Sequence, residues 1–143
     1  MRLPLMAETY GVTAVHASLY EPEKWHYILG ETEAIMSFSK LNSPVCFVGH
    51  SHIPAVFVRE GSGDVSIQKA SRVPIEPGKK YIINVGSVGQ PRDNDARACG
   101  GFLDTEAGEF QLLRIAYPIW LVQEKMVQFE LPMALVERLT LGL

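Results

Sequence analysis

Short apolar, β-branched runs alternate with glycine- and proline-containing turns between residues 44 and 115. The runs include "PVCFVG", "AVFVRE", "KYIINVG" and "EFQLLRIAY", and turns such as "GSGD" and "EPGK" lie between them. Runs of four to eight such residues bounded by turn signals are typical of β-strands. Since short turns join antiparallel neighbours, this stretch predicts a sheet core made mostly of antiparallel strands.

Other patterns flank this strand-rich middle. The earlier run "GVTAVHA" predicts a buried strand, and residues 32–42 have apolar side chains at helical spacing, with Thr32 as the expected N-cap. The tail predicts two helices, one over residues 119–129 and one that begins near Pro132. Because 143 residues leave no room for two full domains, we expect one α+β domain over residues 1–143.

Composition excludes several classes of protein. The net charge is -3 and no basic stripe is present, which argues against a nucleic-acid partner. Cys46 and Cys99 are too few for a disulfide framework, and Cys46 lies in an apolar run where we expect it to be buried. The N-terminus has no signal-peptide pattern and no run of eighteen apolar residues occurs, so we expect a cytoplasmic protein without membrane contact.

Two of the four histidines follow one predicted strand, in "CFVGHSHIPAVFV". His50 and His52 are two positions apart, so their imidazoles point to the same side of an extended chain. Gly49 allows the backbone to turn at the strand end. Neutral imidazole binds Mn, Fe, Zn and Ni ions. The alternative is a loop with two solvated histidines.

A third histidine strengthens the metal interpretation. His16 ends the strand "TAVH", and strands of one sheet often present functional residues at a common edge. His16, His50 and His52 are therefore the candidate metal ligands. His26, in "KWHY", has no such setting and is expected to be structural or exposed.

A glycine-rich segment, "NVGSVGQPRD", follows the strand "KYIIN". Gly86 and Gly89 can expose backbone N–H groups to an anion. Arg92 offers a planar guanidinium for a phosphate group. The alternative is a simple turn in which Arg92 and Asp93 pair with each other or with solvent.

Together, "AVHAS", "VGHSHIP" and "YIINVGSVGQPRDNDARACGGFLD" resemble the calcineurin-like metallophosphoesterases, closest to the bacterial and archaeal branch of predicted phosphodiesterases and diadenosine-tetraphosphatase-like proteins. The resemblance runs from about Leu3 to the end of the chain. It implies a four-layer α/β/β/α sandwich and a dinuclear metal centre that hydrolyses phosphate esters. It also implies that His16 and His50 ligate one ion and His52 the other. The residues it places near the phosphate are Gly86, Ser87, Gly89 and Arg92.

The sequence departs from that family in its acidic motifs. The D-x-H, G-D and G-N-H blocks of the family's front part are missing, and every aspartate follows His52. Two divalent ions about 4 Å apart repel by about 17 kcal/mol at an effective dielectric of about 20. Three neutral imidazoles supply no negative charge to offset this repulsion. We therefore expect the C-terminal portion of a metallophosphoesterase, with at most one partial metal site and negligible activity alone.

Three functions stay open for such a chain. It is an impaired phosphoesterase, a half-enzyme completed by a separate chain, or a non-catalytic oligomeric binding or scaffold module. The sequence assigns no residue a direct catalytic role. If the centre is active, the expected substrate is a small phosphate ester. The resemblance also implies that the strand "GVTAVHA" has lost neighbours, which leaves a strand edge and an apolar face uncovered. We therefore expect a homo-oligomer or a complementing chain.

Overall fold

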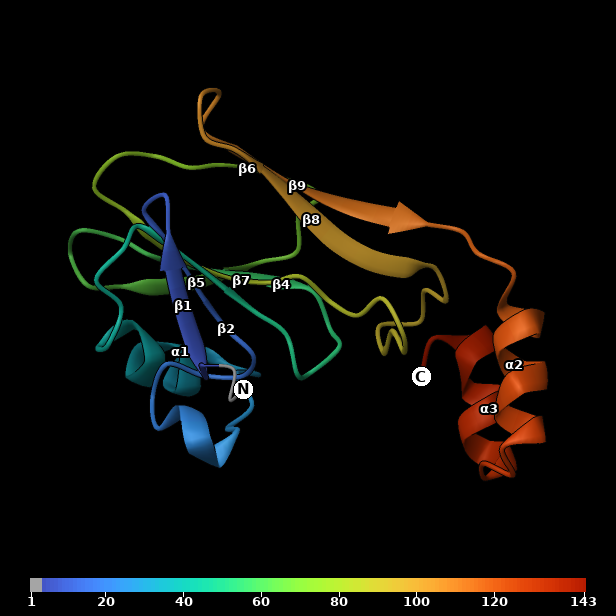
Figure 1. Cartoon of the computed structure of the whole chain (residues 1–143). Helices are drawn as coiled ribbons and strands as arrows, with labels where there is room; N and C mark the ends of the chain where they lie inside the picture. The colour runs from blue at the N-terminus through green and yellow to red at the C-terminus, as the bar shows by residue number, and fades with distance from the viewer. Residues whose placement is uncertain (1–3) are drawn as a thin grey trace.

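The computed structural model describes residues 4–143, so Leu3 lies outside it, and it consists of two β-sheets and three α-helices (Figure 1). One sheet has six strands in the order β1-β2-β3-β7-β4-β5, and the other has three in the order β6-β9-β8. The strands are β1 (Met6–Thr9), β2 (Val12–Val15), β3 (Val45–Val48), β4 (Ala55–Arg59), β5 (Val65–Gln68), β6 (Arg72–Pro74), β7 (Lys80–Asn84), β8 (Ala98–Asp104) and β9 (Glu109–Ile115). The helices are α1 (Glu31–Phe38), α2 (Ile119–Gln128) and α3 (Met133–Leu141), with a 3-10 turn at Pro22–Lys24.

The centre of the six-stranded sheet is parallel. β2 pairs with β3, and β3 pairs with β7, in parallel register, whereas the other strand pairs among the described residues are antiparallel. The predicted mostly antiparallel α+β fold is therefore confirmed, with one exception at its centre. The physical reason is that long connections, through α1 and through β4 to β6, return the chain to the same end of the sheet. The C-terminal ends of β2, β3 and β7 consequently lie along one edge.

The core has two layers, because successive residues of a strand face opposite sides of a sheet. On one side of the six-stranded sheet, Cys46 and Ile82 pack in the cluster that contains Phe38 of α1. On the other side, Tyr81 and Ile83 pack in the cluster that also holds residues of the three-stranded sheet. Each large apolar side chain that is fully buried contributes about 2 kcal/mol of transfer free energy. The sheet that carries the strand ends is thus held rigidly from both faces.

The structure corrects two local expectations. Gly30, not Thr32, is the N-cap of α1, and the Glu33 carboxylate accepts the Gly30 N–H at 3.0 Å. The edge of β2 is not uncovered, because β1 pairs with it antiparallel through a hairpin turn at Tyr10 and Gly11. Both turn residues have positive φ, 49° and 74°, as in a type I′ turn. The chain itself therefore covers this edge, and β1 becomes the exposed edge strand.

The helices are distributed unevenly. α1 packs beside the six-stranded sheet, whereas α2 and α3 form a hairpin that extends away from both sheets beyond the end of β9 (Figure 1). No residue of α2 is buried. Within the described part of the chain, no helix is long and apolar enough to cross a lipid bilayer.

Cys46 is 0% exposed as expected, and burial raises the pKa of its thiol to about 12.

Candidate metal centre at the ends of the parallel strands

His16 and His50 meet at the shared edge of two neighbouring parallel strands. His16 directly follows β2, and His50 follows β3 after Gly49, whose N–H donates to the His16 carbonyl oxygen at 2.9 Å. His16 Nε2 lies 3.2 Å from His50 Nδ1. Two nitrogens that bind one ion at about 2.0–2.1 Å with tetrahedral geometry are about 3.3 Å apart. The distance is that of a hydrogen bond between the two rings, and it also fits two ligands of a single ion. His26, in contrast, is exposed and lies 3.3 Å from a Glu21 oxygen.

His52 lines the same hollow but does not join a three-ligand cluster. The hollow that His16, His50 and His52 line has a volume of about 570 Å³. His52 Nδ1 lies 2.8 Å from the Gln90 carbonyl oxygen, which makes Nδ1 the protonated nitrogen and leaves Nε2 as a lone-pair donor. Across residues 4–143, no three His, Cys, Asp or Glu side chains come close enough to hold a metal ion.

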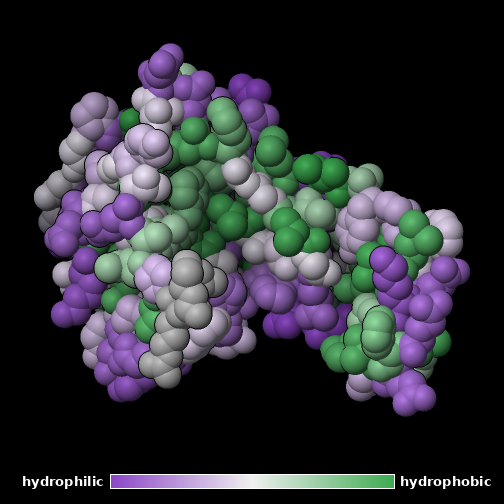
Figure 2. Space-filling view, in the orientation of Figure 1, coloured by the Kyte–Doolittle hydropathy of each residue, from purple (hydrophilic) through white to green (hydrophobic). Residues whose placement is uncertain are grey.

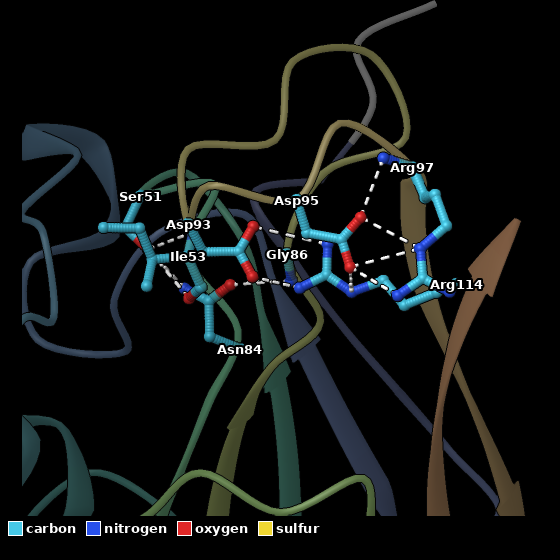
Figure 3. A network of polar contacts seen from close by, with 8 residues as sticks. All are labelled: Ser51, Ile53, Asn84, Gly86, Asp93, Asp95, Arg97 and Arg114. Carbon is cyan, nitrogen blue, oxygen red and sulfur yellow. Dashed lines mark hydrogen bonds and ion pairs between the residues drawn. The ribbon is translucent and has the colours of Figure 1, made fainter. Parts of the chain in front are cut away.

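The histidine loop has a strained backbone that a buried side chain supports. His50 and His52 have φ values of 66° and 62°, a region that residues other than glycine adopt at a cost of about 1–3 kcal/mol each. Asn84 Nδ2 donates to the Gly49 carbonyl at 2.7 Å. The same group donates to Ser51 Oγ at 2.9 Å (Figure 3). Asn84 is 1% exposed. Sequence reasoning missed this residue, although a polar side chain at the end of the apolar strand "KYIIN" was a visible signal.

The surroundings of His50 favour its neutral form, which is the form that binds metals. Burial lowers the pKa of His50, and the nearby charges of His16 and His52 lower it further. The Tyr27 ring stacks on His50 with centroids 4.2 Å apart, and Trp25 lies 4.8 Å from the His16 ring. Both aromatic residues were missed, because nothing in the spacing of "KWHY" indicates that it folds over the strand ends.

The glycine-rich segment reaches the predicted position but does not form the expected anion nest. The Gly86 N–H donates to Asn84 Oδ1 at 3.0 Å, and the Gly89 N–H donates to Ser87 Oγ at 3.2 Å. Gly86 and Ser87 line the same hollow as the histidines. Both N–H groups therefore already have partners, and Asn84 connects this segment to the histidine loop.

Arg92 is held beside the histidine loop by other contacts than those expected. Its guanidinium donates to Gln90 Oε1 at 2.7 and 3.1 Å, and its backbone N–H donates to the His52 carbonyl oxygen at 3.1 Å. The alternative pairing of Arg92 with Asp93 does not form, because Asp93 pairs with Arg114 (Figure 3). The charge of Arg92 is one of those that lower the pKa of His50.

The aspartates after the glycine-rich segment belong to an ion-pair chain. Arg114 pairs with Asp93 and lies 3.7 Å from Asp95, which in turn pairs with Arg97 at 2.6 Å (Figure 3). Hydrogen bonds from the Arg97 side chain are the main reason that the pKa of Asp95 is lowered to about 2. These carboxylates are thus neutralised by arginines instead of facing the histidines.

Comparison with known proteins identifies the class of this chain. No family model matches it. It is 37% identical over 128 residues to an uncharacterized protein, MJ0912, of Methanocaldococcus jannaschii, covering 89% of this chain and 50% of the relative. Its structure matches that of a metallophosphoesterase from Sphaerobacter thermophilus with a TM-score of 0.87 and 35% identity, covering 99% of this chain and 58% of the other. The hypothetical protein PH1004 from Pyrococcus horikoshii has the same fold, with a TM-score of 0.70, 14% identity and coverage of 98% and 51%.

The fold, the strand-end histidines and this similarity agree. The chain belongs to the calcineurin-like metallophosphoesterase superfamily, in which divalent metal ions are the general cofactor. It spans 50% of the curated relative and 58% of the metallophosphoesterase, which is about half of their length.

Proposed function

We propose that this chain supplies the histidine side of a metallophosphoesterase centre and binds at most one divalent ion by itself. The observation that carries the proposal is the 3.2 Å separation of His16 Nε2 and His50 Nδ1 at the ends of two parallel strands. His52, with Nε2 free, is placed to bind a second ion once an acidic ligand stands beside it. Mn, Fe, Zn and Ni ions are the candidates, because all of them accept imidazole.

Charge explains why the chain alone is not competent. Asp93 and Asp95 are paired with arginines. The three histidines are neutral ligands, so they supply no negative charge to offset the charge of the metal ions. When bound, a pair of divalent ions polarises the phosphate ester and activates water, but the repulsion between two ions needs anionic ligands that the described residues do not place here. Arg92 is the side chain that we expect to orient a phosphate group, after release from Gln90. We propose a small phosphate ester as the substrate and the cytoplasm as the location.

Two other functions follow from specific observations. A separate chain with the missing aspartates would convert this protein into half of an enzyme, which the matches to about half of each relative support. A non-catalytic oligomeric binding or scaffold module is supported by the absence of any three-ligand cluster within residues 4–143.

Metal binding and turnover distinguish these proposals. Metal analysis and calorimetric titration with Mn²⁺ should show at most one bound ion per chain, and hydrolysis of bis-p-nitrophenyl phosphate should stay at the blank rate. Binding should be lost in His16→Ala and His50→Ala. His26→Ala is the matched control, because the His26 side chain is exposed and contacts Glu21 instead of the pair formed by His16 and His50.

Two outcomes would refute the proposal. One is binding of two ions per chain with turnover that disappears in His50→Ala. The other is metal binding that survives in the His16→Ala/His50→Ala double variant, because the ion would then lie elsewhere. Absence of any metal binding would favour the scaffold module instead.

A further inference from the structure

The hairpin of α2 and α3, residues 119–141, is named here the C-terminal arm, and its surface is unusually apolar. Trp120 is 58% exposed, Phe129 at the end of α2 is 79% exposed, and Met133 at the start of α3 is 55% exposed. α2 and α3 pack on each other, with only marginal contact to the strands among the described residues. A helical hairpin that exposes this much apolar surface normally packs against another element.

Helix α2 has apolar side chains on two sides that face away from α3. Trp120 and Val127 are seven positions apart and form one stripe, and Val122 and Phe129 form another on the opposite side. The side toward α3 includes Gln123, whose Nε2 donates to the Val136 carbonyl at 2.8 Å. Contact with α3 therefore uses one side of α2 and leaves both stripes open.

The arm is fixed in its extended position at both ends. At one end it continues from β9 through residues 116–118. At the other, the Asn94 N–H donates to the Gly142 carbonyl at 2.9 Å. A Cβ on Gly142 would lie 2.7 Å from the Asp95 nitrogen, so the contact is close. The arm therefore cannot fold over the chain's own small sheet without breaking this anchor.

The outer face of the small sheet is the second uncovered apolar surface. Phe102 of β8 and Leu113 and Ile115 of β9 lie on this face, with exposures of 57%, 38% and 61%, and are named here the outer row. Gly100 and Ala98 stand opposite Leu113 and Ile115, which leaves room beside these side chains. Figure 2 shows apolar surface along this region and on the arm, with a hollow between the arm and the main body.

The total surface is too large for a compact monomer. The chain exposes 8802 Å², whereas a compact protein of 15.9 kDa exposes about 7,350 Å². The excess is about 1,450 Å², and a specific interface buries about 800 Å² on each partner. The excess is therefore larger than the area that one partner of a stable dimer needs to bury.

We propose that two copies of this chain form a dimer by reciprocal contact, in which the arm of each copy packs on the outer row of the other. Helices then cover the outer face of the small sheet, as layered domains require. Each copy gives one arm and receives one, so the assembly closes with twofold symmetry. The inference is independent of metal binding and of phosphoesterase activity.

Light scattering coupled to size exclusion tests the dimer with paired variants. The wild-type chain should have twice its 15.9 kDa mass. The arm variant Trp120→Glu/Phe129→Glu and the row variant Phe102→Glu/Ile115→Glu should each be monomeric. An equimolar mixture of the two should regain a weaker dimer, because the intact arm of the row variant can bind the intact row of the arm variant. Gln128→Glu adds a charge at an exposed polar position of α2 and should stay dimeric.

Several results would overturn the proposal. A wild-type chain that is monomeric at all concentrations, or dimeric only with a complementing chain, excludes a second copy as the occupant. A row variant that stays dimeric, or a mixture that does not associate, excludes the contact between arm and row. If circular dichroism shows that a variant is unfolded, hydrogen exchange of residues 119–141 in the wild-type chain tests the dimer instead. Their protection should fall on dilution, and protection that does not change with concentration contradicts the dimer.

Discussion

Helix α1 and the C-terminal arm contain similar apolar side chains but use them differently. Phe38 of α1 is 1% exposed and packs in the cluster that includes Cys46 and Ile82 of the central strands. Phe129, at the end of α2, is 79% exposed. The difference shows that apolar content alone does not determine burial, because burial also needs a sheet face within reach. The part of the molecule around α1 holds the histidines rigidly, whereas the arm is free to contact another molecule.

The largest expected effect separates these two regions directly. Phe38→Ala should lower the free energy of unfolding by about 4 kcal/mol, since it removes a buried ring and leaves a cavity. Phe129→Ala should change it by less than about 0.5 kcal/mol at concentrations where the chain is monomeric. Urea unfolding followed by circular dichroism measures both values. Equal losses in the two variants would mean that the arm is part of the monomer's cooperative core.

The next effect concerns the polar support of the histidine loop. Asn84→Leu should cost about 3 kcal/mol, because it removes three hydrogen bonds and leaves the buried Gly86 N–H without a partner. The strained loop should relax, and metal binding by His16 and His50 should weaken. Asn42→Leu, at an exposed position, is the control for the change of side chain. Unchanged metal affinity in folded Asn84→Leu would show that the loop does not need this support.

Within the glycine-rich segment, a smaller effect distinguishes two glycines. Gly86 has φ +75° and an added Cβ would lie 2.8 Å from Cys99 Sγ, so Gly86→Ala should cost about 2 kcal/mol. Nothing lies within 4 Å of a Cβ on Gly89, so Gly89→Ala should be within about 0.5 kcal/mol of wild type. Thermal unfolding of the two variants provides the comparison. A harmless Gly86→Ala would contradict the close packing of this segment on Cys99.

The smallest effect depends on pH and lies next to the anchor of the arm. Hydrogen bonds from Arg97 hold the pKa of Asp95 at about 2, below the ordinary value of 3.8. A lowered folded-state pKa stabilises the protein above pH 3.8, and this stabilisation is lost as the pH falls toward 2. Because Arg97 is half exposed, the gain is at most about 1 kcal/mol. Asp95→Asn should therefore be slightly less stable than wild type at pH 6, and the difference should shrink to about a third at pH 2.5. An equal difference at both pH values would contradict this assignment.

Much of the candidate site could be predicted from local sequence. The apolar runs that end at His16 and Gly49 were identified as strands, and residues that follow the strands of one sheet were expected to meet at one edge. This placed His16 and His50 together, as the structure has them. The spacing of His50 and His52 did not predict their positive φ angles, because backbone strain depends on contacts made by distant residues.

The amino-acid sequence by itself determined the strand and helix segments, the buried Cys46 and the histidines at the strand ends, because periodicity and turn residues act over a few neighbouring positions. Only the tertiary structure decided that β2, β3 and β7 run parallel, that Asn84 joins two loops 35 positions apart, and that the arm projects from the small sheet. These features depend on which faces meet after long connections close. Local side-chain patterns carry no information about that choice.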